Sequence, residues 1–255
     1  MLPMIKELSH RLLCNDLSGS VIRAFCKNKI PDIRWQKFQF DITDAGMSNS
    51  MAASIFWGFY EAAEIRFVQK YIKGDLDVIE LGASCGVVSS HILSKLSPKN
   101  RLISVEANKA LQSTWLTNTD RHNVRKSFKT LLNCAIYYDD DHVSFNISNN
   151  TTESSIAKGS IQSSSVMIVP ARKLSSVVED FKIKNYALVC DIEGAEVGIL
   201  LNDAEVFSNC RLLLIELHST EYRNTLYEVE LIKDLIIAKG FNLTDRHGNV
   251  FLFTK

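Results

Sequence analysis

V-I-E-L-G-A-S-C-G, residues 78–86, is the stretch that decides the fold of this chain. It predicts a short apolar strand that ends in an acid, Glu80, and continues into a turn between Gly82 and Gly86. Residues 87–96 then carry apolar side chains at helical spacing. A strand, a glycine turn and a helix in this order form the first unit of a nucleotide-binding α/β fold.

A second acid indicates the kind of cofactor. Residues 102–105 (L-I-S-V) predict another strand, which ends at Glu106. An acid at that position can bridge the two ribose hydroxyls of a nucleoside. The pattern therefore favours a cofactor that contains an adenine nucleoside.

The glycine turn favours S-adenosylmethionine over NAD. A dinucleotide turn needs a glycine in the middle so that the backbone can approach a pyrophosphate, and here the middle residue is Ser84. The carboxylate of Glu80 suits the positive sulfonium and ammonium of S-adenosylmethionine better than a pyrophosphate dianion. The carboxylate of that cofactor could lie on the amides that open the next helix.

Composition sets the remaining limits. The chain has 255 residues, 46% of them hydrophobic, which is enough for one α/β domain over residues 55–255 with an N-terminal extension, residues 1–54. Lys plus Arg (29) balances Asp plus Glu (29), and no segment is basic enough to indicate a nucleic-acid partner. The six cysteines form no C-x-x-C pair, so we expect no metal site and a reducing compartment. With neither a signal peptide nor an apolar run of membrane-spanning length, we expect a cytoplasmic protein.

The hydrophobic pattern predicts alternating strands and helices. For the extension we expect a helix over 4–29 interrupted near 15–19, a strand over 35–42, a loop over 43–54 and a helix over 55–72. The core strands are expected near 77–81, 102–106, 131–136, 187–191 and 211–217, with an extra segment at 143–147. The helices are expected near 87–96, 109–121, 196–206 and 225–239, before a closing hairpin at 241–254 with its turn at 245–249. This alternation indicates a mostly parallel sheet covered on both faces. The polar segment 148–165 is a candidate lid.

A second acidic motif, A-L-V-C-D-I-E-G-A-E, occupies residues 187–196. It again follows an apolar strand, so Asp191 is expected at the same carboxyl edge of the sheet as Gly82 and Glu106. Glu196 could instead only favour a helix N-terminus. The strand that ends I-E-L-H then brings His218 to this edge.

These stretches resemble the FkbM family of S-adenosylmethionine-dependent methyltransferases. The resemblance covers roughly residues 55–254 and is carried most specifically by D-I-E-G-A-E at 191–196 followed by I-E-L-H at 215–218. The family's Y-E-x-x-E-x-x-F series matches Tyr60, Glu61, Glu64 and Phe67, and its N-x-A-I matches residues 133–136. Where the family turn usually reads D-V-G-A-N-x-G, this chain has E-L-G-A-S-C-G, which keeps the acid and both glycines.

The resemblance implies a Rossmann-like class I methyltransferase fold, with a seven-stranded sheet and a C-terminal antiparallel hairpin. The hydrophobic pattern adds a mainly helical N-terminal extension. The resemblance also implies O-methylation of a small hydroxylated acceptor, such as a glycan or another natural product. We expect the S-adenosylmethionine site to comprise Glu80, Gly82, Ala83, Ser84, Cys85, Gly86, Glu106, Ala107, Cys134, Ala135 and Asp191. The acceptor proton is expected to pass to His218 or Asp191, with Glu193 orienting the acceptor or the base. Tyr60 and Glu61 are candidates for closing over the site.

Two other functions remain open. A nicotinamide-dependent oxidoreductase could use the same architecture, although Ser84 and the D-I-E-G-A-E motif argue against it. A relative without catalytic activity could act as a partner-binding subunit, although the acids at 80, 106 and 191 argue against that. Residues 1–54 could shape the acceptor pocket or form a homodimer contact.

Overall fold

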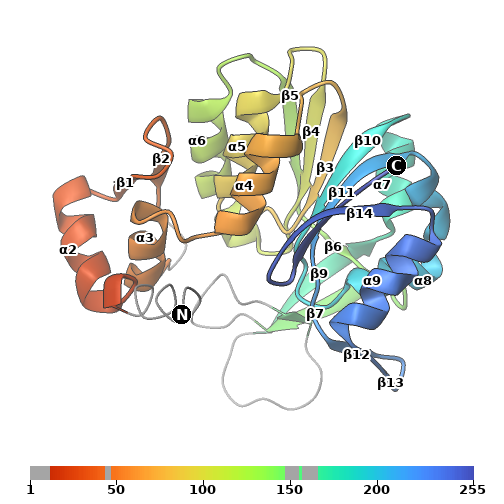
Figure 1. Cartoon of the computed structure of the whole chain (residues 1–255). Coiled ribbons are helices and arrows are strands. Elements are labelled where there is room, and N and C mark those ends of the chain that lie inside the picture. The colour runs from red at the N-terminus through yellow and green to blue at the C-terminus, as the bar shows by residue number, and fades with distance from the viewer. Residues whose placement is uncertain (1–11, 44–46, 147–154, 157–165) are drawn as a thin grey trace.

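One seven-stranded sheet organises the part of the chain that the computed structural model describes, which is residues 12–43, 47–146, 155–156 and 166–255. Its strands are β3 (Asp77–Leu81), β4 (Arg101–Val105), β5 (Phe128–Leu132), β10 (Tyr186–Cys190), β11 (Cys210–Glu216), β14 (Asn242–His247) and β15 (Val250–Thr254). Their order across the sheet is β14-β15-β11-β10-β3-β4-β5 (Figure 1). Neighbouring strands from β11 to β5 are parallel, whereas β15 is antiparallel to both β11 and β14. The predicted fold class is confirmed.

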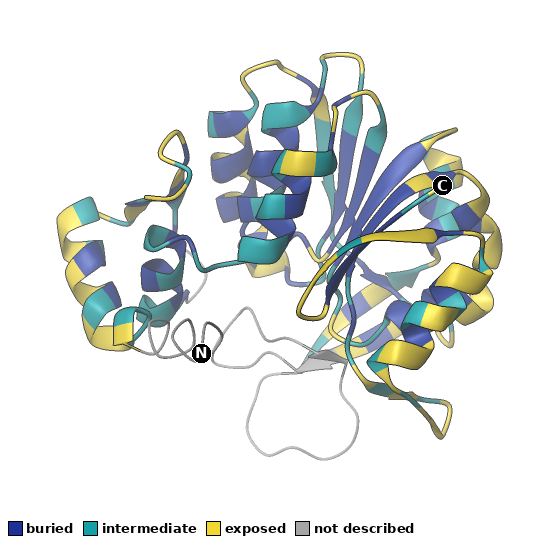
Figure 2. Cartoon of the chain, in the orientation of Figure 1, coloured by how far each residue is buried: buried dark blue, intermediate teal, exposed yellow. Residues whose placement is uncertain are grey.

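Helices cover both faces of this sheet (Figure 1). On one face lie α4 (Ala62–Tyr71), α5 (Val87–Lys95) and α6 (Gln112–His122), and on the other lie α7 (Leu174–Asp180), α8 (Glu196–Asn202) and α9 (Val229–Ala238). Alternate residues of each strand point to opposite faces. Val78 packs with the first set of helices and its neighbour Ile79 with the second. Figure 2 shows that the strands between the two helix layers are mostly buried. Burying such a side chain contributes about 1.5–3 kcal/mol, so both layers stabilise the sheet.

Smaller elements surround the carboxyl edge of the sheet. A second sheet with the order β6-β9-β7-β8 contains β6 (Ala135–Ile136), β7 (His142–Asn146), β8 (Ser155–Ile156) and β9 (Val166–Arg172). A hairpin joins β12 (Thr220–Tyr222) to β13 (Thr225–Tyr227), and two short 3-10 helices are η1 (Lys109–Leu111) and η2 (Ala204–Ser208). The expected lid at 148–165 lies outside the described residues except for β8.

The N-terminal extension packs beside the glycine turn. It contains α2 (Asp16–Cys26), β1 (Lys29–Pro31), β2 (Gln39–Asp41) and α3 (Asn49–Phe56). The side chain of Asn118 on α6 donates to the carbonyls of Asp41 (3.0 Å) and Cys85 (2.9 Å). These bonds connect the extension to the turn, and Cys85 packs into the apolar cluster of the extension. Where the chain divides into domains stays a prediction.

The expected elements of the extension are partly wrong. The break in the first helix falls at Cys14–Asn15, because the Asn15 side chain accepts from the amide of Ser18 (2.9 Å) and caps α2. That helix ends at Cys26, not at residue 29, and residues 1–11 are not described. The strand expected over 35–42 is limited to β2, since the Asp32 side chain accepts from two following amides and forms a turn.

Two further expectations fail for reasons of local capping. The loop expected over 43–54 contains the start of α3, whose N-terminus is capped by the Ser48 hydroxyl. The helix expected over 55–72 is broken between α3 and α4, where Glu61 has a φ of 47°. This backbone conformation cannot continue a right-handed helix.

Pairing between strands explains the misassignments in the core. The strand expected near 131–136 is divided into β5 and β6, which belong to different sheets. The start of the helix expected over 225–239 is instead β13, which pairs with β12. Residues 245–247, expected in a turn, extend β14. The strand β9 and the helix α7 were not expected at all.

No helix within the described part of the chain combines the length and apolar character needed to cross a membrane.

We predict that Gly82→Ala destabilises the protein far more than Gly248→Ala. Both glycines have positive φ, 85° and 64°, which costs an alanine about 1–2 kcal/mol. A Cβ at Gly82 would also lie 1.8 Å from the backbone oxygen of Asp191, whereas a Cβ at Gly248 meets nothing within 4 Å. Denaturant unfolding should show at least about 2 kcal/mol of additional loss for Gly82→Ala. Equal losses would contradict this account of the turn.

Candidate active site

The glycine turn is held against the end of the neighbouring strand. The amides of Gly82 and Ala83 both donate to the carbonyl of Val105, at 3.0 and 3.1 Å. Ser84 has a φ of 46°, a conformation that costs a non-glycine residue free energy. These bonds therefore place the turn directly over the carboxyl end of β4.

Glu106 completes this connection. Its carboxylate accepts from the amide of Ser84 (2.8 Å) and from the amide of Asn108 (2.7 Å). A carboxylate has about four acceptor positions, so two remain available for ligand hydroxyls. The sequence prediction that this acid lies beside the turn is consistent with its position.

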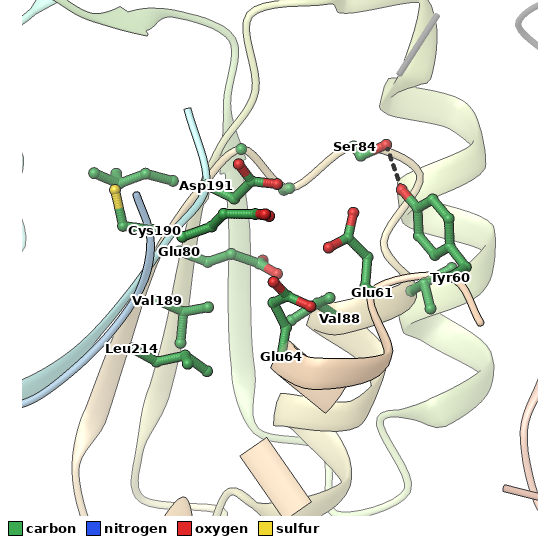
Figure 3. A pocket seen from close by; sticks show the side chains of 15 residues that line it. Tyr60, Glu61, Glu64, Glu80, Ser84, Val88, Val189, Cys190, Asp191 and Leu214 are labelled. Atoms are coloured by element: carbon green, nitrogen blue, oxygen red, sulfur yellow. Dashed lines mark hydrogen bonds between the residues drawn. The ribbon is translucent and has the colours of Figure 1, made fainter. Parts of the chain in front are cut away.

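A pocket opens beside the turn (Figure 3). It contains about 410 Å³ of empty space and is lined by five of the predicted cofactor residues, Glu80, Gly82, Ala83, Ser84 and Asp191. Glu64 and Glu216 also line it, and no binding role was expected for either. Both stand in motifs of the family resemblance, which mark the two residues but do not indicate that they meet at this pocket.

The far side of the pocket is built by the segment that leads into α4. Tyr60 and Glu61 line the pocket there, and the Tyr60 hydroxyl donates to the Ser84 hydroxyl at 3.2 Å (Figure 3). Their predicted role in closing over the site is untested, but both reach it.

Carboxyl groups crowd this pocket. Glu61, Glu64 and Glu216 offer oxygens that all lie within 4.8 Å of one another. Burial raises the pKa of Glu64 to about 7, and the neighbouring Glu216 raises it too. Burial also raises the pKa of Glu61 well above its usual range, and the charges of Glu64 and Asp191 add to that rise. The arrangement is one that a positive ligand would stabilise.

Glu80 lies beneath the pocket and is 1% exposed. One carboxylate oxygen, Oε2, accepts from the hydroxyls of Ser89 (2.6 Å) and Ser104 (2.5 Å). The other, Oε1, is buried without a hydrogen-bond partner in the described structure. Burial raises the pKa of this carboxyl to about 7.

The second motif forms an adjacent cluster around His218. Its Nδ1 lies 3.3 Å from Oε1 of the fully buried Glu196, and its Nε2 lies 3.5 Å from Oε2 of Glu193. Atoms of Asp191, Glu193 and His218 lie within 4.8 Å of one another, so the structure brings all three predicted catalytic residues together. The hydrogen bond with Glu196, followed by the nearby charges of Glu196 and Glu193, raises the pKa of His218 to about 9. Burial and the neighbouring carboxyls of Glu216 and Glu193 raise that of Asp191 to about 8.

The other six predicted cofactor residues, Glu106 among them, are not part of the pocket lining. The side chain of Cys85 is buried toward the extension, and Gly86 opens α5 close to Trp115. Ala107 and Ala135 share one small apolar cluster, and Cys134 lies in the main core. Their roles stay predictions.

Asn133 connects this region to the ribose acid. Its side-chain amide donates to the carbonyls of Glu106 (3.0 Å) and Ala107 (2.9 Å). Asn133, which directly precedes the predicted cofactor residues Cys134 and Ala135, is therefore bonded to the backbone at Glu106.

The fold and this edge of the sheet define a methyltransferase of the Rossmann-like class. A family model described as "Methyltransferase FkbM domain" matches residues 80–243, and the chain belongs to this family. Its cofactor is S-adenosylmethionine.

Comparison with solved structures finds only distant similarity. An FkbM methyltransferase from Methylobacillus flagellatus KT is 13% identical, with 80% of this chain and 54% of that chain covered and a TM-score of 0.42. A putative tRNA (m1A22) methyltransferase from Streptococcus pneumoniae, solved with S-adenosyl-L-methionine, is 11% identical, with 75% and 70% covered and a TM-score of 0.40. Fibrillarin from Aeropyrum pernix is 13% identical, with 76% and 74% covered and a TM-score of 0.40. No curated protein matches the chain.

The residues of the pocket fit the cofactor. S-adenosylmethionine carries two positive groups, and the pocket contains the unpartnered buried oxygens Glu80 Oε1 and Asp191 Oδ1. Leaving such groups unpaired costs about 1–3 kcal/mol or more. We propose that these carboxylates face the methionine end and that Glu106 binds the ribose.

We predict that Glu106→Ala weakens binding of S-adenosylhomocysteine ten- to hundredfold. Hydrogen bonds to a charged group contribute about 1.5–3 kcal/mol, which corresponds to that change in dissociation constant. Calorimetric titration measures it. Glu205→Ala, which removes an exposed acid on η2, should leave the constant within twofold. An unchanged constant for Glu106→Ala would remove it from the site.

We predict that Glu80→Gln becomes more stable than the wild type as pH rises from 5 to 8. The folded-state pKa of about 7 lies above the unfolded value of 4.5, so ionisation of Glu80 destabilises the cofactor-free protein as pH rises through this window. The relative gain should reach at most about 3 kcal/mol. Denaturant unfolding at both pH values measures it.

The matched control is Glu230→Gln on α9. The pKa of Glu230 is lowered by its hydrogen bonds with Lys233 and Arg246, so this variant should show no gain at pH 8. If both variants respond alike to pH, ionisation of the buried Glu80 carboxyl does not cost the protein stability.

Proposed function

We propose that this chain transfers the methyl group of S-adenosylmethionine to a hydroxyl of a small acceptor, either a glycan or another natural product. The observation that carries the proposal is the cluster of Asp191, Glu193 and His218 beside the cofactor pocket. An alcohol holds its proton tightly at neutral pH, so its methylation benefits from a base within hydrogen-bond reach. This cluster offers such bases.

Glu196 orients the imidazole in this proposal. Its Oε1 lies 3.3 Å from Nδ1 of His218. The buried carboxylate therefore accepts a hydrogen bond from the Nδ1–H group, and Nε2 is left to exchange a proton with the acceptor. Glu193 lies 3.5 Å from Nε2, where it can hold the acceptor hydroxyl or stabilise the imidazolium.

The charge of His218 has to change before it can act as a base. With a pKa of about 9 it is protonated at neutral pH in the cofactor-free protein. When bound, S-adenosylmethionine supplies an electrophilic methyl group on a positively charged sulfur. A positive charge near the imidazole lowers the pKa of His218 and favours the neutral form. Asp191 is the second candidate: its pKa of about 8 means that it also has to lose its proton first, after which its carboxylate is a stronger base than an ordinary aspartate.

Other features support the remaining parts of the proposal. The six cysteines are free thiols, which suits a reducing compartment such as the cytoplasm. Val87 both lines the cofactor pocket and packs against the extension. We therefore propose that residues 1–54 help to shape the acceptor side of the site, and a homodimer contact is the alternative.

We predict that His218→Ala lowers methyl transfer at least a hundredfold while the affinity for S-adenosylhomocysteine stays within threefold. A general base contributes about 10²–10⁴ to the rate. The measurement is the initial rate of S-adenosylhomocysteine formation with neutral glycosides as acceptors. A loss below tenfold would end the candidacy of His218 and transfer the role to Asp191, which Asp191→Asn then tests.

Glu196→Gln separates orientation from chemistry. Since the bond with Glu196 is the largest cause of the raised pKa of His218, this variant should move the acidic limb of the pH–rate profile to lower pH. An unmoved limb would show that His218 does not titrate in that limb.

Cofactor binding without methyl transfer to any hydroxylated acceptor would favour a non-catalytic binding subunit.

A further inference from the structure

A larger cavity lies next to the catalytic cluster and has no part in the site described above. Its volume is about 460 Å³, within the range of about 300–1,000 Å³ for small-molecule sites. It lies between the segment after β6, the start of α8 and the β12–β13 hairpin. The residues that define it are Tyr137, Tyr138, Asp139, Gly194, Tyr222 and Arg223.

The cavity and the catalytic cluster are built from the same two chain segments. Gly194 lines the cavity and directly follows Glu193. A Cβ at Gly194 would lie 3.0 Å from the hydroxyl of Thr220, two residues after His218. The wall of the cavity at Gly194 is therefore close to the segment that carries the proposed base.

Tyrosine rings make up much of the wall. The Tyr138 hydroxyl donates to Asp203 (2.8 Å), and the side-chain amide of Asn202 donates to the Tyr222 hydroxyl (2.9 Å). Gly198 makes room for both rings, since a Cβ there would lie 3.3 Å from Tyr138 and 3.8 Å from Tyr222. The rings are thus held in place, with the electron-rich face that packs against the weakly positive C–H groups of a sugar.

The charges of the lining disfavour an anionic ligand. Asp139 forms an ion pair with Arg223, whose guanidinium also lies 5.1 Å from the centre of the Tyr222 ring. The other charged residue of the lining is Glu221. Two acids and one base therefore line the cavity, which favours a neutral ring with hydroxyl groups over a phosphate or a uronic acid.

We infer that this cavity binds a neutral glycosyl unit of the acceptor, stacked on Tyr222, with one hydroxyl directed toward His218. The inference rests on the proposed function, because it names the acceptor class of that same reaction. Asp139 and Arg223, which line the cavity, supply an acceptor and donors for the other hydroxyls.

The test is binding of methyl glycosides of glucose, galactose and fucose to protein saturated with S-adenosylhomocysteine, measured by saturation-transfer NMR. The wild type should bind at least one of them, and the methyl glycoside of glucuronic acid at least tenfold more weakly. Tyr222→Ala should weaken binding at least tenfold, whereas Tyr222→Phe, which keeps the ring, should stay within about threefold. Leu226→Ala, which changes an exposed residue of the same hairpin outside the lining, is the matched control and should match the wild type.

The inference is overturned if no neutral glycoside binds, or if Tyr222→Ala leaves binding unchanged. If Tyr222→Ala does not fold, Tyr137→Ala, which also changes a ring of the lining, takes its place with the same expectation. Preferential binding of a nucleoside monophosphate would also contradict it.

A parallel methyl-transfer assay separates this inference from the proposed function. Glycosides that bind through Tyr222 but are never methylated would refute the function and leave the cavity assignment standing. If glycosides are methylated and Tyr222→Ala does not change the KM, the cavity assignment is refuted and the proposed function stands.

Discussion

The approach of three strand ends at the glycine turn is the constraint on which the rest of the site depends. Two amides of the turn bind the carbonyl of Val105 at the end of β4, and Glu106 binds the amide of Ser84 in return. On the other side, the missing side chain of Gly82 lets the carbonyl of Asp191, after β10, lie where a Cβ would stand. Glu106, the glycine turn and the motif that begins at Asp191 are therefore held together at one edge of the sheet.

Uncompensated negative charge is the second organising feature. Glu61, Glu64, Glu80 and Asp191 all have raised pKa values because burial removes them from water in the absence of a cation. Such an arrangement costs the free protein stability and is stabilised by a positive ligand, which S-adenosylmethionine is. Ionisation of these carboxyl groups therefore costs the protein stability as pH rises through their raised pKa values.

Periodicity within short segments predicted most helices and strands of the core. It failed where a helix cap or pairing with a distant strand sets the secondary structure. The strands β3, β4, β10 and β11 are continuous apolar runs, and their limits were expected to within one residue. The strand β13 was expected as helix, because only its pairing with β12 makes it extended. In the site, Asp191, Glu193 and His218 could be placed at one edge because parallel strands end together. The carboxyl group of Glu64 could not be placed there, because nothing in its own helix indicates which strand end it faces.

The sequence by itself determined the fold class, the position of the glycine turn, the acids that follow the parallel strands and the resemblance that led to the family. These depend on residue order within short segments, through strand and helix periodicity and the conformational freedom of glycine. Only the tertiary structure decided that α4 adds Glu61 and Glu64 to the pocket, that Glu196 binds His218, and that three tyrosines surround a cavity beside it. Those contacts join residues far apart in the chain, and their geometry is set by how helices and hairpins pack on the sheet.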